Sequence, residues 1–202
     1  EPLLYEKHSQ AGPHSCKGDI NNDGLDDIYV SGSLNTSGFL YVQQSSGLFE
    51  VTTQNAFKKD ARYEDGGCAF IDLNSDGFLD LYVGSSGYEL NPNSELLVDR
   101  LYLNDGAGTF KSSGTVLPQF LGNTTCVIAA DYNGDGKKDL FVGGGAKPGN
   151  YPLSTSSRIL KNDKGKLVDV TKSIAPFLTE MGVINAAIWS DYNSDGKPDL
   201  LL

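Results

Sequence analysis

The sequence predicts an all-β fold made of β-propeller blades of four antiparallel strands, and three observations support this prediction. An acidic loop returns four times, with its first aspartate at positions 19, 72, 131 and 191. Short apolar segments, many of them rich in aromatic and β-branched residues, lie between the loops at similar offsets. No segment keeps apolar residues at helical spacing for more than about two turns, and residues 174–183 come nearest to doing so.

The period of the repeat separates the candidate architectures. Successive loops begin 53, 59 and 60 residues apart. Periods near this length are typical of propellers and of helical arrays. Helical arrays need sustained amphipathic helices, and the missing helical periodicity argues against them. Four short strands in each unit therefore favour propeller blades.

Each unit contains its apolar segments in the same order. In the second unit, the first segment (GGCAF, residues 66–70) precedes the acidic loop and the second (DLYVGS, residues 80–85) follows it. The third is DRLYLND at residues 99–105, and a glycine turn leads into the last, GTFKSSG at residues 108–114. Asn, Asp and Gly tolerate positive φ, so this turn has the composition of a β-hairpin.

The ends of the sequence indicate an incomplete ring. Residues 3–10 (LLYEKHSQ) resemble the last strand of a blade, as in GLFEVTTQ at residues 47–54, and the fourth unit contains only two strands. We expect one partial propeller over residues 1–202, with about three and a half blades of a seven-bladed ring. Its expected parts are the last strand of a preceding blade (1–12), three blades (13–54, 64–118 and 122–172) and the inner hairpin of a further blade (182–202).

The acidic loops have the composition of cation sites. Each loop carries Asp at positions one, five and nine, Asn at position three and Gly at position six, where the backbone must turn sharply. Position seven varies, so only its backbone carbonyl can serve as a ligand. Hard oxygen ligands without His or Cys favour calcium over zinc or copper, and magnesium prefers tighter sites that keep several waters.

Three other interpretations of the loops are weaker. An EF-hand needs a bidentate Glu at position twelve and flanking helices, but position twelve is Val30, Val83, Val142 or Leu202. A dockerin-type pair needs a much shorter repeat with a helix after each loop. A turn that is merely solvated does not require the same Asp, Asn and Gly positions in four copies.

The loop pattern D-x-N-x-D-G-x-x-D before an aliphatic strand, together with RLYLNDGAGTF at residues 100–110, resembles FG-GAP/VCBS repeats, the integrin α-like β-propeller family. The resemblance covers essentially the whole chain, and it implies about four Ca²⁺ ions, one in each loop between the first and second strands. The Phe-Gly and Gly-Ala-Pro landmarks are not evident, VGGGAKPG at residues 142–149 being nearest, so the bacterial-type VCBS branch fits better. Carried over by position, with position seven binding through its carbonyl, the implied ligands are Asp19, Asn21, Asp23, Leu25, Asp27, Asp72, Asn74, Asp76, Phe78, Asp80, Asp131, Asn133, Asp135, Lys137, Asp139, Asp191, Asn193, Asp195, Lys197 and Asp199.

The resemblance implies a calcium-stabilised, non-catalytic interaction or adhesion module of a secreted or cell-surface protein, in an extracellular, cell-surface or periplasmic location. Its expected partner is a protein or a glycan. A polysaccharide-active enzyme of the lyase type and a lectin are the alternatives. No catalytic residues are predicted, since the chain has two histidines and no HExxH, GxSxG or P-loop motif.

Charge and hydropathy exclude other partners. The formal net charge of −10 argues against nucleic acid and anionic lipid. No apolar run approaches the roughly 20 residues of a membrane span, so direct membrane insertion is not expected. We expect the rest of the propeller to come from a longer chain or from a second copy, because half a ring leaves unpaired strand edges. The three cysteines are expected to be buried free thiols.

Two long insertions are the candidate partner-binding segments. They cover residues 85–99 and 144–157, between the second and third strands of their units. Such loops lie on the propeller face opposite the loops between first and second strands. Their tyrosines and amides suit recognition by stacking and adaptable hydrogen bonds, and the alternative is a tolerated surface insertion. The candidate ligand-binding residues are Tyr88, Asn91, Asn93 and Tyr151.

Overall fold

The computed structural model describes residues 13–114 and 117–202, and it contains three four-stranded antiparallel sheets and one hairpin. The first sheet consists of β1 (Ser15–Gly18), β2 (Asp27–Val30), β3 (Phe39–Gln43) and β4 (Phe49–Thr52). The second consists of β5 (Glu64–Ile71), β6 (Asp80–Ser86), β7 (Arg100–Asn104) and β8 (Phe110–Ser112). The third consists of β9 (Thr124–Ala130), β10 (Asp139–Gly144), β11 (Arg158–Asn162) and β12 (Leu167–Asp169), and the hairpin of β13 (Ile188–Ser190) and β14 (Asp199–Leu201).

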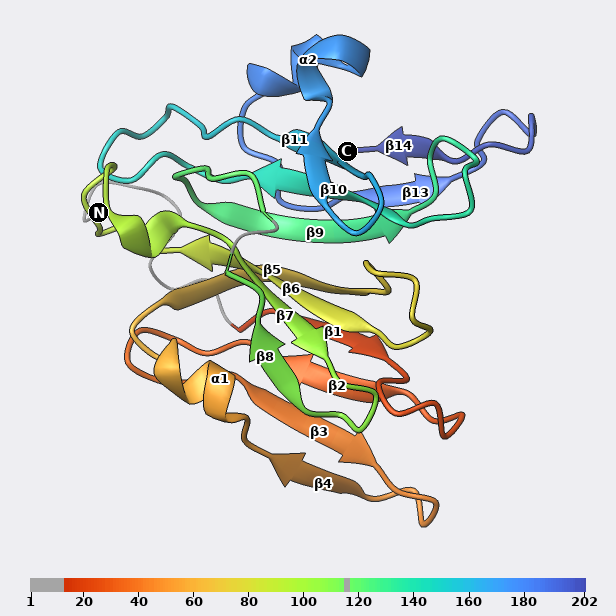
Figure 1. The fold of residues 1–202 in the computed structure, drawn as a ribbon. Helices are drawn as coiled ribbons and strands as arrows, with labels where there is room; N and C mark the ends of the chain where they lie inside the picture. The colour runs from red at the N-terminus through yellow and green to blue at the C-terminus, as the bar shows by residue number, and fades with distance from the viewer. Residues whose placement is uncertain (1–12, 115–116) are drawn as a thin grey trace.

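The sheets are arranged as propeller blades, which confirms the predicted fold class. Within each sheet, the strands lie in chain order, each antiparallel to the next. The first strands of successive units lie next to one another, β1 beside β5, β5 beside β9 and β9 beside β13 (Figure 1). The strand predicted within residues 1–12 lies outside the described residues, and the seven-bladed ring stays a prediction.

The hydrophobic core lies between the sheets. The cluster between the first two sheets contains Phe57 from the short helix α1 (Asn55–Lys59), which follows β4. The Phe57 ring packs edge-on against Tyr29 of β2 and Tyr102 of β7, with ring centroids 5.4 and 4.9 Å apart. This helix was not predicted from the sequence, because two adjacent apolar side chains in five residues produce no helical periodicity.

In residues 13–114 and 117–202, three other short helical segments connect the strands. They are η2 (Glu95–Leu97), α2 (Thr171–Ile174) and η3 (Pro176–Thr179), each of which buries one side chain. Of residues 174–183, which come nearest to helical spacing in the sequence, only Ile174 in α2 and Pro176–Thr179 in η3 are helical. In the part of the chain that the structure describes, no helix is long and apolar enough to span a membrane.

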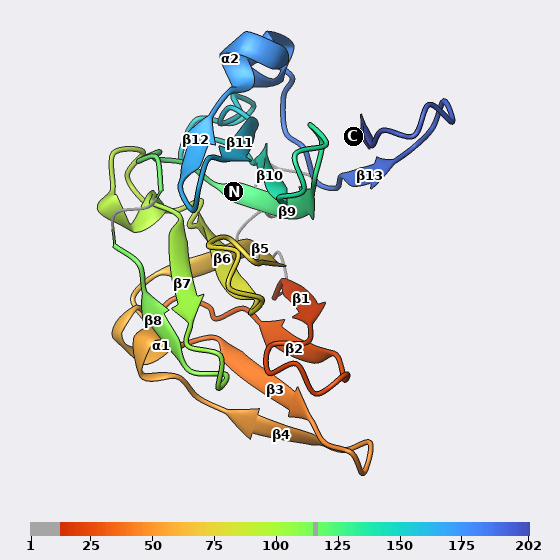
Figure 2. The same ribbon diagram turned by 45° about the vertical axis from the view of Figure 1, so that its right-hand side comes forward.

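The hairpin β13–β14 projects from the third sheet (Figure 2). Large apolar side chains in and next to this hairpin are exposed to solvent: Ile188 is 61% exposed, and Leu201 and Leu202 are 40% and 44% exposed. The indole N–H of Trp189 is buried without a hydrogen-bond partner. The hairpin therefore presents an apolar surface of the kind that the other blades bury.

The three cysteines are free thiols. Cys68 is buried, and Cys16 packs against the same core cluster. Burial raises the pKa of the Cys16 and Cys126 thiols, so both are protonated at neutral pH.

Candidate metal centres and the opposite face

The four acidic loops lie at the same ends of their sheets, on the right-hand side of Figure 1. Each loop is closed by a strand pair in which position nine faces the residue just before position one. These pairs are Gly18 with Asp27, Ile71 with Asp80, Ala130 with Asp139, and Ser190 with Asp199. Because this pairing is the same in all four units, every loop has the same length between its paired ends.

All four loops have the same unusual backbone conformation. Position four is left-handed in every copy, with φ of 57° at Asn22, 61° at Ser75, 75° at Gly134 and 61° at Ser194. The glycine at position six is left-handed as well, with φ between 83° and 88°. Glycine adopts this conformation without steric cost, so the repeated Gly fixes the turn that wraps the loop.

The loop side chains turn inward and bond the loop's own amides. The Asp at position one accepts hydrogen bonds from the N–H groups of positions five and six, at 3.1 and 2.8 Å for Asp19. Asn21 accepts from the N–H of Asp23, and Asp23 accepts from the N–H of Leu25. The same bonds recur in the loops that begin at Asp72, Asp131 and Asp191.

Position nine is buried in the three complete sheets. Asp27, Asp80 and Asp139 are each 0% exposed. Asp80 accepts hydrogen bonds from the N–H groups of Leu73 at position two and Asn104 at the end of β7. Burial, together with the nearby charges of Asp76 and Asp72, raises the pKa of Asp80 to about 6. Burial raises the pKa of Asp27 and Asp139 in the same way.

This donor set fits calcium. Each loop gathers carboxylate and amide oxygens, in the first three loops around a buried carboxylate. A divalent cation there would offset the burial and the repulsion that raise the pKa of that carboxylate. An oxygen that accepts one N–H bond keeps a second lone pair for a ligand bond. Within the described residues, no group of three acidic, histidine or cysteine side chains is already arranged to hold an ion. The side chains bond loop amides instead, and a cation would draw them closer together.

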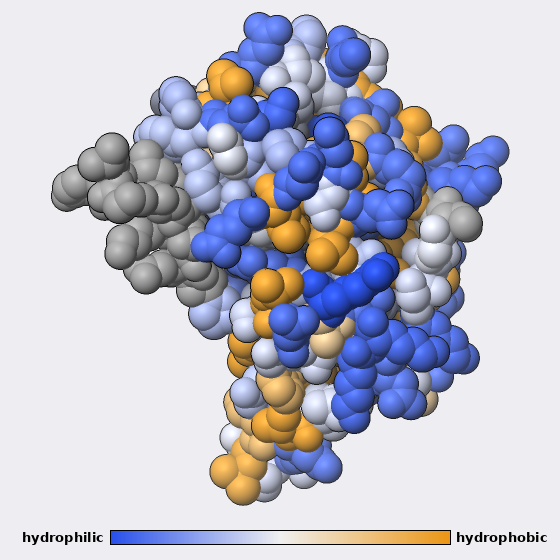
Figure 3. Space-filling model, turned by 90° about the vertical axis from the view of Figure 1, so that its left-hand side faces the viewer, coloured by the Kyte–Doolittle hydropathy of each residue, from blue (hydrophilic) through white to orange (hydrophobic). Residues whose placement is uncertain are grey.

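The two long loops lie at the other ends of the strands, on the left-hand side of Figure 1. Tyr88, Asn91 and Asn93 lie between β6 and β7, and Tyr151 lies between β10 and β11. Tyr151 is 51% exposed, Asn91 and Asn93 are exposed, and Tyr88 is half-buried. The Asn91 side chain accepts from the N–H of Asn93 at 2.9 Å and so shapes its own turn. Hydrophilic residues cover much of this face, with small apolar groups between them (Figure 3).

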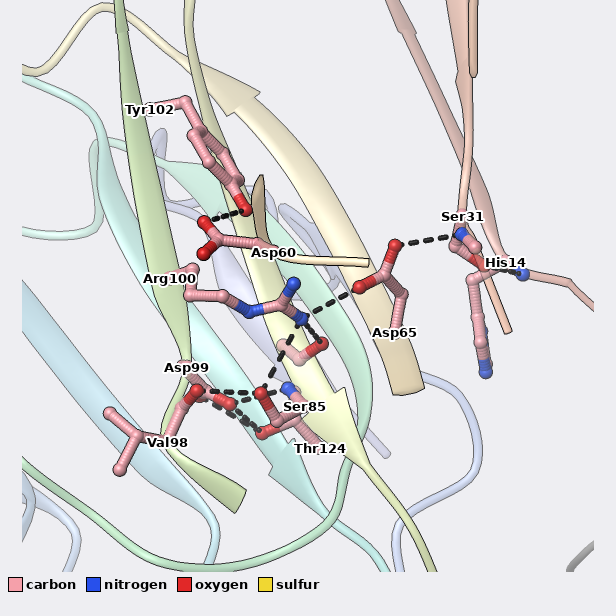
Figure 4. A network of polar contacts seen from close by, with 12 residues as sticks. His14, Ser31, Asp60, Asp65, Ser85, Val98, Asp99, Arg100, Tyr102 and Thr124 are labelled. Carbon is pink, nitrogen blue, oxygen red and sulfur yellow. Dashed lines mark hydrogen bonds and ion pairs between the residues drawn. The ribbon is translucent and has the colours of Figure 1, made fainter. Parts of the chain in front are cut away.

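A polar network next to the long loops was not predicted from the sequence. Arg100 of β7 donates to Asp65 of β5 at 2.7 Å, and both side chains are almost completely buried (Figure 4). Asp65 also accepts from the Tyr29 hydroxyl and from the N–H of Gly32, at 2.8 and 2.7 Å. The Arg100 guanidinium lies 4.3 Å from the centre of the Tyr63 ring. The only sequence signal was a charged residue at the start of an apolar strand.

The FG-GAP-like repeat family matches residues 19–83 and 84–142, which together make up more than half of the chain. The chain belongs to the FG-GAP-like repeat family. This confirms the family predicted from the loops. The first match begins at Asp19 and contains the first two acidic loops, and the second match contains the third loop.

A curated relative agrees with this membership. Cartilage acidic protein 1 of Mus musculus is 26% identical over 198 residues, which is 95% of this chain and 28% of that protein. This chain thus corresponds to little more than a quarter of the length of that protein.

One solved structure shows a similar fold. A lectin of Agrocybe aegerita, described as recognising non-reducing terminal N-acetylglucosamine, has a TM-score of 0.50 and 21% identity over 77% of this chain and 36% of its own. The V. cholerae biofilm matrix protein Bap1 has a TM-score of 0.42 and 19% identity over 95% of this chain and 28% of its own.

Proposed function

We propose that this chain is a calcium-stabilised, non-catalytic interaction module that binds a protein or glycan partner outside the cell. The observation that carries the proposal is the repeated loop, which folds around its own carboxylate and amide oxygens in four copies. Three of these loops close on a fully buried aspartate. Calcium outside cells is abundant enough to occupy sites of modest affinity, which supports the extracellular location.

In each loop, the residues at positions one, three, five and nine would hold the ion through side-chain oxygens, and position seven through its carbonyl. When bound, the ion supplies positive charge and no chemistry of its own. The chain's carboxylates would then no longer repel one another, so the loop ends and the strands joined to them would be held in register.

The number of bound ions tests the calcium part of the proposal. We expect about four Ca²⁺ ions per chain, measured by elemental analysis after gel filtration and by isothermal titration calorimetry. Asp135→Ala should remove about one ion, because it deletes the position-five ligand of the third loop. Asp26→Ala is the matched control, since Asp26 is an exposed acid at position eight, which is not a ligand position. Equal calcium content in the wild type and Asp135→Ala would contradict the assignment.

The face with the long loops is the proposed partner surface. The double variant Tyr88→Ala, Tyr151→Ala should weaken partner binding at least about tenfold while calcium content and Tm stay nearly unchanged, because these loops lie at the strand ends away from the metals. Binding is first sought on a glycan array, and the strongest glycan is then titrated. If no glycan binds, the partner is a protein.

The matched control is Tyr192→Ala, which removes an 81% exposed tyrosine on the metal side. It should leave partner binding intact. If binding survives the double change but is lost when a metal loop is altered without unfolding, the partner docks on the metal face instead.

The exposed hairpin supports a proposal about assembly. Ile188, Leu201 and Leu202 present an apolar surface on β13–β14, and surfaces of this kind in a sheet edge invite pairing. We propose that further chain or a second copy completes the propeller at this edge.

A further inference from the structure

In the first two sheets, an asparagine of the following sheet donates a hydrogen bond to each acidic loop. Asn104, the last residue of β7, is 4% exposed and donates from Nδ2 to the carbonyl of Ile20 at 2.7 Å. Ile20 is position two of the preceding blade's loop and lies 84 residues away in the chain. The same Nδ2 also donates to the carbonyl of Leu79 at 3.1 Å.

The next blade repeats this arrangement. Asn162, the last residue of β11, is 1% exposed and donates from Nδ2 to the carbonyl of Leu73 at 2.9 Å. Leu73 is position two of the second loop. Two equivalent bonds across two interfaces indicate a feature of the repeat rather than an isolated contact.

In both asparagines, the side-chain oxygen accepts a hydrogen bond that fixes the orientation of the amide group. Asn104 Oδ1 accepts from the N–H of Gly106 at 3.1 Å, and Asn162 Oδ1 accepts from the N–H of Gly165 at 3.0 Å. Each amide therefore caps the turn that follows its own strand while it donates to the preceding blade. The donor group is oriented before it meets the loop.

These bonds join the buried aspartates of three blades into one chain of contacts. The N–H of Ile20 donates to Asp27, and the carbonyl of Ile20 accepts from Asn104, whose own N–H donates to Asp80. The N–H of Leu73 donates to Asp80. The carbonyl of Leu73 accepts from Asn162, whose own N–H donates to Asp139. A shift of one aspartate thus changes the position of a residue whose carbonyl the next blade holds.

We infer that Asn104 and Asn162 are positioning residues that couple each calcium loop to the following blade, so that the affinity of the first loop depends on Asn104 and that of the second on Asn162. This inference rests on the proposed calcium function. Asn104 and Asn162 do not touch the ion; each holds the carbonyl of the residue whose N–H orients the position-nine ligand.

The test is calcium titration of Asn104→Ala by isothermal titration calorimetry. We expect about tenfold weaker binding at one of the four sites, because one buried hydrogen bond to the loop is lost. The affected site is identified with Asp23→Ala, which disables the first loop. In that background, the tenfold loss caused by Asn104→Ala should disappear, leaving at most the smaller effect of the lost bond to the Leu79 carbonyl of the second loop. Asn162→Ala should still weaken one of the remaining sites by about tenfold.

A second measurement covers the case in which Asn104→Ala lowers stability. Amide hydrogen exchange in calcium-free protein should be faster at Ile20 in Asn104→Ala and unchanged at Tyr192. Asn91→Ala is the matched control, since this asparagine bonds only its own turn on the opposite face, and it should leave all four affinities unchanged.

The outcomes separate this inference from the proposed function. A wild type that binds no calcium overturns the proposed function and this inference with it. A wild type that binds four ions, with the first-loop affinity and Ile20 exchange unaltered in Asn104→Ala, overturns this inference alone.

Discussion

Removal of calcium is expected to lower the Tm of this chain by at least ~10 °C. A single site filled at about one hundred times its Kd stabilises the folded state by ~2.7 kcal/mol, which corresponds to roughly 5–10 °C for a chain of this size. Four sites should therefore produce a larger shift than one. Without the ion, each loop keeps its carboxylates together, and in the first three loops one of them is buried beside the others.

The measurement is differential scanning calorimetry in excess EDTA and after calcium is restored. Calcium should restore the Tm fully and magnesium only in part, because magnesium requires a tighter octahedral site. Asp26→Ala should respond to EDTA as the wild type does. An unchanged melt after metal removal has been verified would show that the loops are stable without an ion.

Replacement of Arg100 should produce the largest loss among single substitutions outside the loops. Its guanidinium and the Asp65 carboxylate form an ion pair with side chains only 10% and 5% exposed. Arg100→Ala would leave Asp65 as a buried charge held only by the Tyr29 hydroxyl and the N–H of Gly32. Breaking one partner of a buried pair costs about 3–5 kcal/mol in the free energy of unfolding.

The matched control is Arg62→Ala. Arg62 is exposed and lies over the same Tyr63 ring, at 5.3 Å from its centre, so its loss should change stability by no more than about 0.5 kcal/mol. Urea denaturation followed by far-UV circular dichroism measures both variants. If Arg100→Ala costs no more than Arg62→Ala, the buried pair does not contribute to stability in the expected way.

The repeat period, the strand order and the loop composition could all be predicted from the sequence. Each depends on short distances along the chain. The bonds within the first loop join residues no more than seven apart, so their spacing is directly visible in the sequence. Four copies of the same pattern then distinguish a structural motif from chance.

The contacts between blades could not be predicted in this way. Asn104 meets Ile20 across 84 residues, and Arg100 meets Asp65 across 35. Asn104 follows an apolar strand, where an Asn-Asp-Gly sequence is sufficiently explained by a hairpin turn. Its second role, as a donor to the preceding blade, requires the sheets to be packed against each other.

The position-nine aspartates show most directly which properties depend on local sequence and which depend on packing. Asp80 and Asp199 follow nearly identical loop sequences, and both begin the second strand of their unit. Asp80 is fully buried with a raised pKa, whereas Asp199 remains partly exposed. The difference arises because β7 lies next to β6 in the same sheet and its last residue donates an N–H to Asp80. The described residues contain no third strand next to β14. Local sequence therefore specifies the ligands of each loop, and packing of the outer strands sets the burial and charge balance in which those ligands act.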